Sequence, residues 1–127
     1  MNKVVHFEIP FDQQERAQKF YQDVFGWQIN KFGEMDYWMA MTCKCDQNSM
    51  MPTEPGAING GLLKRDEYGK SPVIVIDVPN VDEHIEKVKK AGGKLVMPKF
   101  PVGDFGLYAR VADTEGNVIG IWQTVKK

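Results

Sequence analysis

The feature of this sequence that most constrains its fold is an internal repeat. When the sequence is aligned with itself so that Ile9 lies on Ile76, other residues are also aligned with a partner of the same expected structural role. These roles are the core of a strand, the apolar stripe of a helix and the end of a helix. These further pairs are Phe11 with Val78, Tyr21 with Val88, Gly26 with Gly93, and Ile29 with Val96. Two copies of one supersecondary unit are therefore predicted within the chain.

Each copy is predicted to have the element order βαβββ. In the first copy, strands are expected over 4–9, 27–29, 37–42 and 58–64, with a helix ending at Phe25; in the second, strands are expected over 73–78, 94–97, 107–111 and 118–124, with a helix after Asn80. The spacing of Asp12 and Glu15, and that of Asn80 and Glu83, is typical of a capping box at a helix start. Segments 44–57 and 98–106 are rich in turn-forming residues, and we expect loops there, the first of them mobile.

The predicted fold class is α+β, with one domain made of two βαβββ modules. Module one covers about 3–64, a linker 65–71 and module two about 72–125. A curled mixed sheet with its own helix on one face leaves the other face bare. Two such faces, related by a pseudo-twofold axis, are expected to enclose an open, barrel-like cleft.

Composition and charge exclude several functional classes. The 127 residues have a formal charge of −1 and 43% are hydrophobic. These values are typical of one ordinary globular domain and give no electrostatic footprint for nucleic acid or anionic lipid. No apolar run is long enough to span a membrane and no signal-peptide pattern is present, so we expect a cytoplasmic protein.

The only cysteines, Cys43 and Cys45, form a CxC pair. Such a pair can bind a soft metal or form a redox couple, but metal sites usually draw on two such pairs or on one pair with nearby histidines. The simpler interpretation places both residues at the end of a strand.

Strand alternation predicts which side chains face the cleft. If Phe7 and Ile9 face the helix, His6 and Glu8 face the cleft together, two residues apart. They are the candidate catalytic pair, because a carboxylate in a partly apolar cleft can serve as a general base. A hydrogen-bonded pair that only fixes strand packing explains the same pattern.

Further polar and aromatic residues are candidates for ligand binding, since small-molecule pockets combine aromatic surface with few polar groups. These candidates are Trp38, Asn59, Asp77, Tyr108 and Trp122. Trp122 is the strongest of the aromatic candidates, because Gly120 is expected to leave room beside it. Each aromatic residue can equally be part of the core.

Four segments resemble a known superfamily. They are HFEIPFDQQERAQKFYQDVFGW near the start, INGGLLKR, VIVIDVPNVDEHIEKVKKAGGKLVMPK and VADTEGNVIGIWQ. The first is similar to the opening module of the vicinal oxygen chelate superfamily, which includes glyoxalase I, extradiol dioxygenases and bleomycin-resistance proteins. The other three together more closely resemble a glyoxalase-like branch of it. The resemblance implies paired modules and a homodimer, but it implies no single activity, because one scaffold hosts many reactions.

Metal-dependent members of this superfamily hold a divalent ion with four side chains, one from the first and one from the last strand of each module. His6 matches one of these positions, whereas Val73 and Gly120 match two others and the fourth falls on or beside Gly60 and Gly61. One imidazole does not hold a catalytic metal. We therefore predict no metal and no other cofactor; the one route to a divalent ion combines His6 with Glu8 and Asp77.

Three functional hypotheses remain open. In the first, a glyoxalase-like protein binds a small, partly apolar molecule, for sequestration, sensing or metal-free chemistry by His6 and Glu8. In the second, it is a metal-dependent lyase, isomerase or dioxygenase. In the third, it is an interaction module whose cleft is filled by its own side chains. The sequence does not decide whether the chain is an enzyme.

Overall fold

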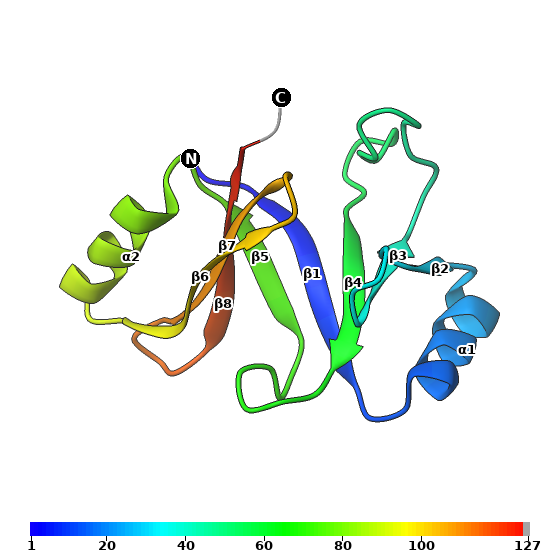
Figure 1. Ribbon diagram of the computed structural model, residues 1–127, viewed down its shortest axis with the longest axis horizontal. Helices are drawn as coiled ribbons and strands as arrows, with labels where there is room; N and C mark the ends of the chain where they lie inside the picture. The colour runs from blue at the N-terminus through cyan, green and yellow to red at the C-terminus, as the bar shows by residue number, and fades with distance from the viewer. Residues whose placement is uncertain (126–127) are drawn as a thin grey trace. The chain divides into compact units, whose positions relative to one another are not determined.

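The computed structural model describes residues 1–125, which fold into two compact units. The first unit is His6–Pro72, and the second combines Met1–Val5 with the chain from Val73 onward. Each unit contains one helix and four strands, with mixed parallel and antiparallel pairing, so the fold class is α+β as predicted (Figure 1).

In the first unit the elements are β1 (Val4–Phe11), α1 (Gln14–Phe25), β2 (Gln28–Lys31), β3 (Tyr37–Met41) and β4 (Asn59–Lys64). The strands are ordered β2-β3-β4-β1, and only β1 and β4 are parallel. The core lies between α1 and one face of these strands. It consists of Phe11, Ile29, Ala40 and Leu62, with Ala17 and Tyr21 of α1 packed against it.

In the second unit the elements are β5 (Val73–Asp77), α2 (Val81–Lys90), β6 (Lys94–Val102), β7 (Gly106–Ala112) and β8 (Val118–Thr124). The strand order β5-β8-β7-β6 repeats that of the first unit, element for element. Its core joins Val81 and Ile85 of α2 to Ala109, Val111 and Ile121. The internal repeat in the sequence is thus a repeat of topology.

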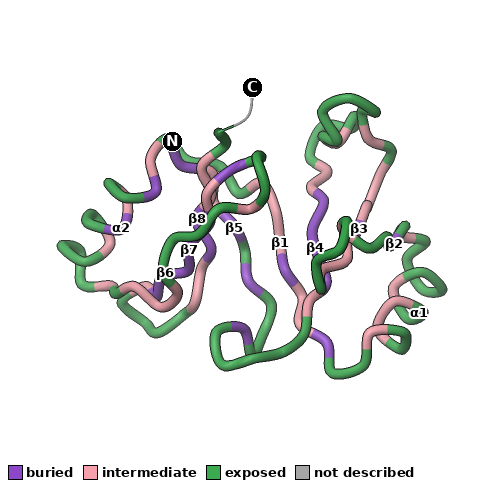
Figure 2. The backbone as a smooth tube through the Cα atoms, viewed as in Figure 1, coloured by how far each residue is buried: buried purple, intermediate pink, exposed green. Residues whose placement is uncertain are grey.

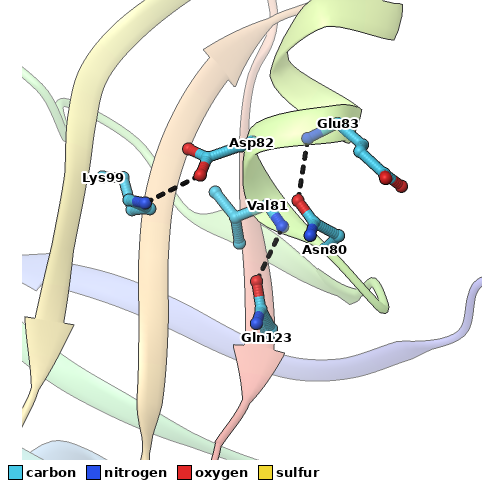
Figure 3. Close-up of polar contacts among 6 residues, drawn as sticks. All are labelled: Asn80, Val81, Asp82, Glu83, Lys99 and Gln123. Carbon is cyan, nitrogen blue, oxygen red and sulfur yellow. Dashed lines mark hydrogen bonds and ion pairs between the residues drawn. The ribbon is translucent and has the colours of Figure 1, made fainter.

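The two helices differ in how they begin. Asn80 caps α2, because its side-chain oxygen accepts a hydrogen bond from the Glu83 amide at 2.9 Å, as predicted (Figure 3). The predicted cap at Asp12 is wrong. α1 starts after Gln13, which makes no side-chain cap, while Asp12 pairs with Arg65 at 3.0 Å. Figure 2 shows buried residues in α2 but none in α1.

Two strands are longer than predicted, and both continue through proline. β1 includes Pro10, and β6 runs through Pro98 and Pro101 to Val102, where a loop was expected. Proline is tolerated in strands at the edge of a sheet, where its missing N–H is not needed. This explanation applies to β6, which is the last strand in the order and has register shifts near Met97 and Phe100, whereas Pro10 of β1 lies opposite Leu63 of β4.

The segment between β3 and β4 is folded back on itself. Lys44 and Thr53 are joined by a backbone hydrogen bond of 3.0 Å, and Cys45 and Pro52 form an isolated bridge.

Among the described residues, no helix is long and apolar enough to cross a membrane.

Candidate functional site

His6 and Glu8 lie on the face of β1 that is turned away from α1. Phe7 and Ile9 pack toward the helix, so the alternation of β1 places His6 and Glu8 together on the opposite face. His6 is half-buried and Glu8 is only 5% exposed. We call this side of the first unit, with the side chains of His6, Glu8, Tyr37 and Asn59, the open face because α1 does not cover it, although Glu8 and Asn59 are themselves buried.

Tyr37 brings a hydroxyl to the His6 imidazole. The Tyr37 Oη and His6 Nε2 atoms are 2.7 Å apart, which is a hydrogen bond. Tyr37 reaches this position because β4 has no side chain at Gly61, where a Cβ would lie 2.0 Å from the Tyr37 hydroxyl. The glycine and the tyrosine therefore position the imidazole together.

Burial and charge act in opposite directions on His6. Desolvation lowers the pKa of His6 below its ordinary value, because burial disfavours the charged imidazolium. The nearby Glu8 charge raises the pKa, but by less. The net effect holds the imidazole neutral at physiological pH.

Asn59 stands beside His6 in the parallel ladder of β1 and β4. Its Oδ1 atom accepts a hydrogen bond of 2.9 Å from the Thr42 backbone amide, and its Nδ2 atom donates one of 2.9 Å to Cys45 Sγ. Both polar atoms of the Asn59 side chain are thus hydrogen-bonded. These two bonds connect the open face to the segment between β3 and β4.

Trp38 lies on the other face of the sheet from His6. It packs edge-on against Phe11, with ring centroids 5.5 Å apart, and belongs to the hydrophobic cluster under α1. The structure therefore brings together His6, Glu8 and Asn59 but not Trp38.

In the second unit Asp77, Trp122 and Tyr108 form a row across three strands. Asp77 is opposite Trp122 in the β5–β8 pairing, and Trp122 is opposite Tyr108 in the β7–β8 pairing. These side chains share the face turned away from α2, as the alternation predicted for Asp77 and Trp122.

The expected space at Gly120 is not present. A Cβ at this position would lie 2.5 Å from the Tyr108 hydroxyl, so the tyrosine fills the volume that we expected to be free beside Trp122. Arg110, which is buried, donates from Nε to the same hydroxyl at 3.1 Å. The expectation that Gly120 leaves room for a ligand beside Trp122 is therefore wrong. Trp122 nevertheless lies on the predicted face, between Asp77 and Tyr108.

The positions that hold a divalent ion in metal-dependent relatives do not fit one here. Val73 offers no donor, and Gly61 and Gly120 are covered by Tyr37 and Tyr108. Across residues 1–125 no group of three or more His, Cys, Asp or Glu side chains could hold a metal ion. His6 is therefore the one potential metal ligand among these positions.

Arg110 was not expected on either face, and Tyr37 was not distinguished from the other aromatic residues that can supply pocket surface. The signal for Tyr37 was available in β3, where alternation places Tyr37 and Trp38 on opposite faces. Once Ala40 is assigned to the core, Trp38 follows it and Tyr37 must face His6. Arg110 gave no such signal, because a charged residue inside an apolar strand is equally consistent with an exposed edge.

Comparison with known proteins identifies the family of this chain. Residues 3–42 match the family model described as bleomycin resistance protein-like N-terminal. A glyoxylase-like domain-containing protein of Didymella fabae is 32% identical over 90% of this chain and 88% of its own length. A Mycobacterium tuberculosis protein named "Putative glyoxylase CFP32" is 32% identical over 87% of this chain, which spans only 41% of that relative.

Solved structures share the fold at low sequence identity. A hypothetical protein from Bacillus halodurans C-125 has a TM-score of 0.65 at 16% identity, covering 99% of this chain and 96% of that one. The Streptomyces coelicolor methylmalonyl-CoA epimerase has a TM-score of 0.64 at 14% identity, covering 99% of each chain. The chain belongs to the glyoxalase-like proteins of the vicinal oxygen chelate superfamily.

Proposed function

We propose that the protein binds a small, partly apolar molecule on the open face of the first unit, and that His6 and Glu8 exchange a proton with it without a metal. The observation that carries this proposal is the 2.7 Å hydrogen bond between His6 Nε2 and Tyr37 Oη. It holds a neutral, half-buried imidazole at a fixed position two residues from a buried carboxylate.

This pair has the properties of a general base. Because desolvation lowers the pKa of His6, the imidazole is neutral and can accept a proton at physiological pH. Once it is protonated, the negative charge of Glu8 favours the imidazolium, since the same charge raises the pKa of His6. Tyr37 orients the ring, and the phenol can share its hydrogen bond with a polar group of the ligand.

The open face also offers apolar surface. Met39 is opposite Gly61 in the β3–β4 pairing and therefore shares this face with Tyr37. An apolar surface with a few oriented polar groups is the usual composition of a small-molecule site.

The ligands of the structural neighbours suggest a class of probe. One neighbour is methylmalonyl-CoA epimerase in complex with methylmalonyl-CoA and NH4+, at a TM-score of 0.63 and 15% identity. Methylmalonyl-CoA is a thioester with an acidic C–H bond next to the carbonyl. We propose carbonyl compounds with such an acidic C–H as the substrate class.

The test is exchange of that hydrogen for deuterium, followed by proton NMR in D2O with metal-depleted protein. The probes are methylmalonyl-CoA and the smaller carbonyl compound methylglyoxal. His6→Gln and Glu8→Gln are each expected to slow exchange by about a hundredfold or more, which is typical for loss of an acid–base group. His84→Gln is the matched control, because His84 lies on α2, outside the open face, and its Nδ1 atom is hydrogen-bonded to the Asn80 carbonyl at 3.1 Å.

Two results would contradict the proposal. One is exchange no faster than in buffer, or exchange that is unaffected by both variants. The other is stoichiometric divalent metal in protein purified without chelator that disappears in His6→Ala, which would favour the metal-dependent lyase, isomerase or dioxygenase.

A further inference from the structure

A second feature of the first unit adjoins the open face at Asn59, whose side chain donates a hydrogen bond to Cys45 Sγ. A hollow of about 650 Å³ is formed where β3 ends and the chain folds back on itself. Four sulfur-containing side chains line it: Met41, Cys43, Cys45 and Met50. Both cysteines are free thiols and half-buried.

The sulfur atoms approach each other closely. Cys45 Sγ lies 3.5 Å from Met41 Sδ. Two sulfur ligands of one metal ion, each about 2.3 Å from it, are separated by at most about 4.6 Å. Cys43 is two residues from Cys45 and lines the same hollow, where its Sγ atom donates a hydrogen bond of 3.1 Å to the Lys44 carbonyl that metal binding would replace. The spacing of the contact therefore matches that of two ligands sharing an ion.

We infer that this hollow binds one soft monovalent cation, Cu(I), through the thiolates of Cys43 and Cys45 and the thioether of Met41. Met50, in the middle of the segment between β3 and β4, lines the hollow as a further thioether. Thiolate and thioether ligands select Cu(I), whereas Zn²⁺ sites are usually completed by four thiolate, imidazole or carboxylate donors. Asp46 also lines the hollow, but its Oδ1 atom accepts the backbone amides of Asn48 and Ser49 at 2.9 and 2.8 Å.

Neighbouring groups suit a negatively charged sulfur. The Asn59 amide donates a hydrogen bond of 2.9 Å to Cys45 Sγ, and such bonds are stronger when the acceptor is charged. Lys44 lies between the two cysteines and lines the same hollow. On binding, two Cu–S bonds replace two S–H bonds and two protons pass to the buffer, while copper stays Cu(I). The two thiolates and the ion leave a charge of −1, in a hollow that is lined by one further cation, Lys44, and two carboxylates, Asp46 and Glu54.

The test is a titration of the reduced full chain with Cu(I) under anaerobic conditions, in competition with bicinchoninate. One Cu(I) per chain is expected. Cys45→Ser is expected to weaken binding by about a hundredfold and Met41→Leu by about tenfold, because a thiolate contributes more than a thioether. Met51→Leu is the matched control with unchanged affinity, since Met51 is exposed, neighbours Met50 and does not line the hollow.

The wild-type chain provides a second measurement that does not depend on the folding of variants. Saturation with Cu(I) is expected to protect both cysteines from iodoacetamide, as counted by mass spectrometry. Failure of the chain to compete with bicinchoninate, unprotected cysteines, or equal affinities of Met41→Leu and Met51→Leu would each overturn the inference.

Discussion

Two tyrosines occupy the space above two glycines, once in each unit. Tyr37 covers Gly61 and Tyr108 covers Gly120, and in each case the tyrosine lies on the strand next to that of the glycine. A glycine here is required by the close approach of the ring rather than by backbone conformation. The tyrosine hydroxyls are thereby placed beside His6 in one unit and beside Arg110 in the other.

Gly61→Ala should therefore destabilise the protein. The new Cβ would lie 2.0 Å from the Tyr37 hydroxyl, and overpacking of this kind costs about 1–3 kcal/mol. Alanine regains only about 0.5–1 kcal/mol by restricting the unfolded chain. Urea unfolding should show a net loss in the wild-type background and little or none in a Tyr37→Ala background. Equal losses in both backgrounds would show that the ring is not the obstacle.

His6 should make stability depend on pH. Because its pKa is lowered in the folded chain, the unfolded chain binds a proton first as pH falls through the ordinary value of 6.5. The contribution of His6 is complete above that value and is lost as pH falls toward the lowered pKa. Urea midpoints measured between about pH 7.5 and pH 5.5 should decrease more steeply for the wild type than for His6→Gln. Parallel decreases would contradict this assignment.

At the scale of elements, α2 begins with two hydrogen-bonded caps and α1 with none. The amides of Glu83 and Val81 are both satisfied, the first by Asn80 and the second by Gln123 of β8 at 2.9 Å (Figure 3). The second contact ties the start of the helix to the sheet that it covers. Satisfying free amides at a helix start stabilises the helix.

Asn80→Ala is expected to lower the free energy of unfolding by about 1 kcal/mol, which is typical for loss of a helix cap. Gln123→Ala should also destabilise the protein, because the Val81 amide loses its acceptor. Gln13→Ala at the start of α1 is the matched control and should have little effect, since Gln13 makes no cap. A loss at Gln13 as large as that at Asn80 would refute this account.

The elements also show where sequence patterns stop being informative. Asp12 and Glu15 have capping-box spacing, but Asp12 pairs with Arg65, a residue far away in the sequence. Prolines in 98–101 predict a loop, but β6 needs few donors as the last strand of its unit. A tertiary partner overrode the local preference at Asp12, and an edge position in the sheet overrode it in β6.

At the scale of the whole molecule, the internal repeat predicted two units of the same topology. Strand alternation predicted which side chains share a face within each unit. His6 with Glu8, and Asp77 with Trp122, share faces because alternation depends only on the strand pattern. Trp38 could not be assigned in this way, because choosing its face requires knowing that Ala40 packs with Leu62. That choice depends on strand register, which the connecting segments set.

The family resemblance implies a homodimer, which stays a prediction. Sedimentation equilibrium at micromolar concentration should give twice the chain mass of 14.5 kDa. A mass of 14.5 kDa at every concentration tested would exclude self-association in that range.

The grouping of Met1–Val5 with the chain from Val73 onward has a consequence for dissection of the protein. The Lys3 carbonyl accepts the Asp77 amide at 2.8 Å, so the second unit takes part of its structure from the opposite end of the polypeptide. A protease nick after Pro72 would leave one fragment holding a piece that the other requires. The carboxy-terminal fragment should consequently fold poorly by itself and recover when a synthetic peptide of the first residues is supplied.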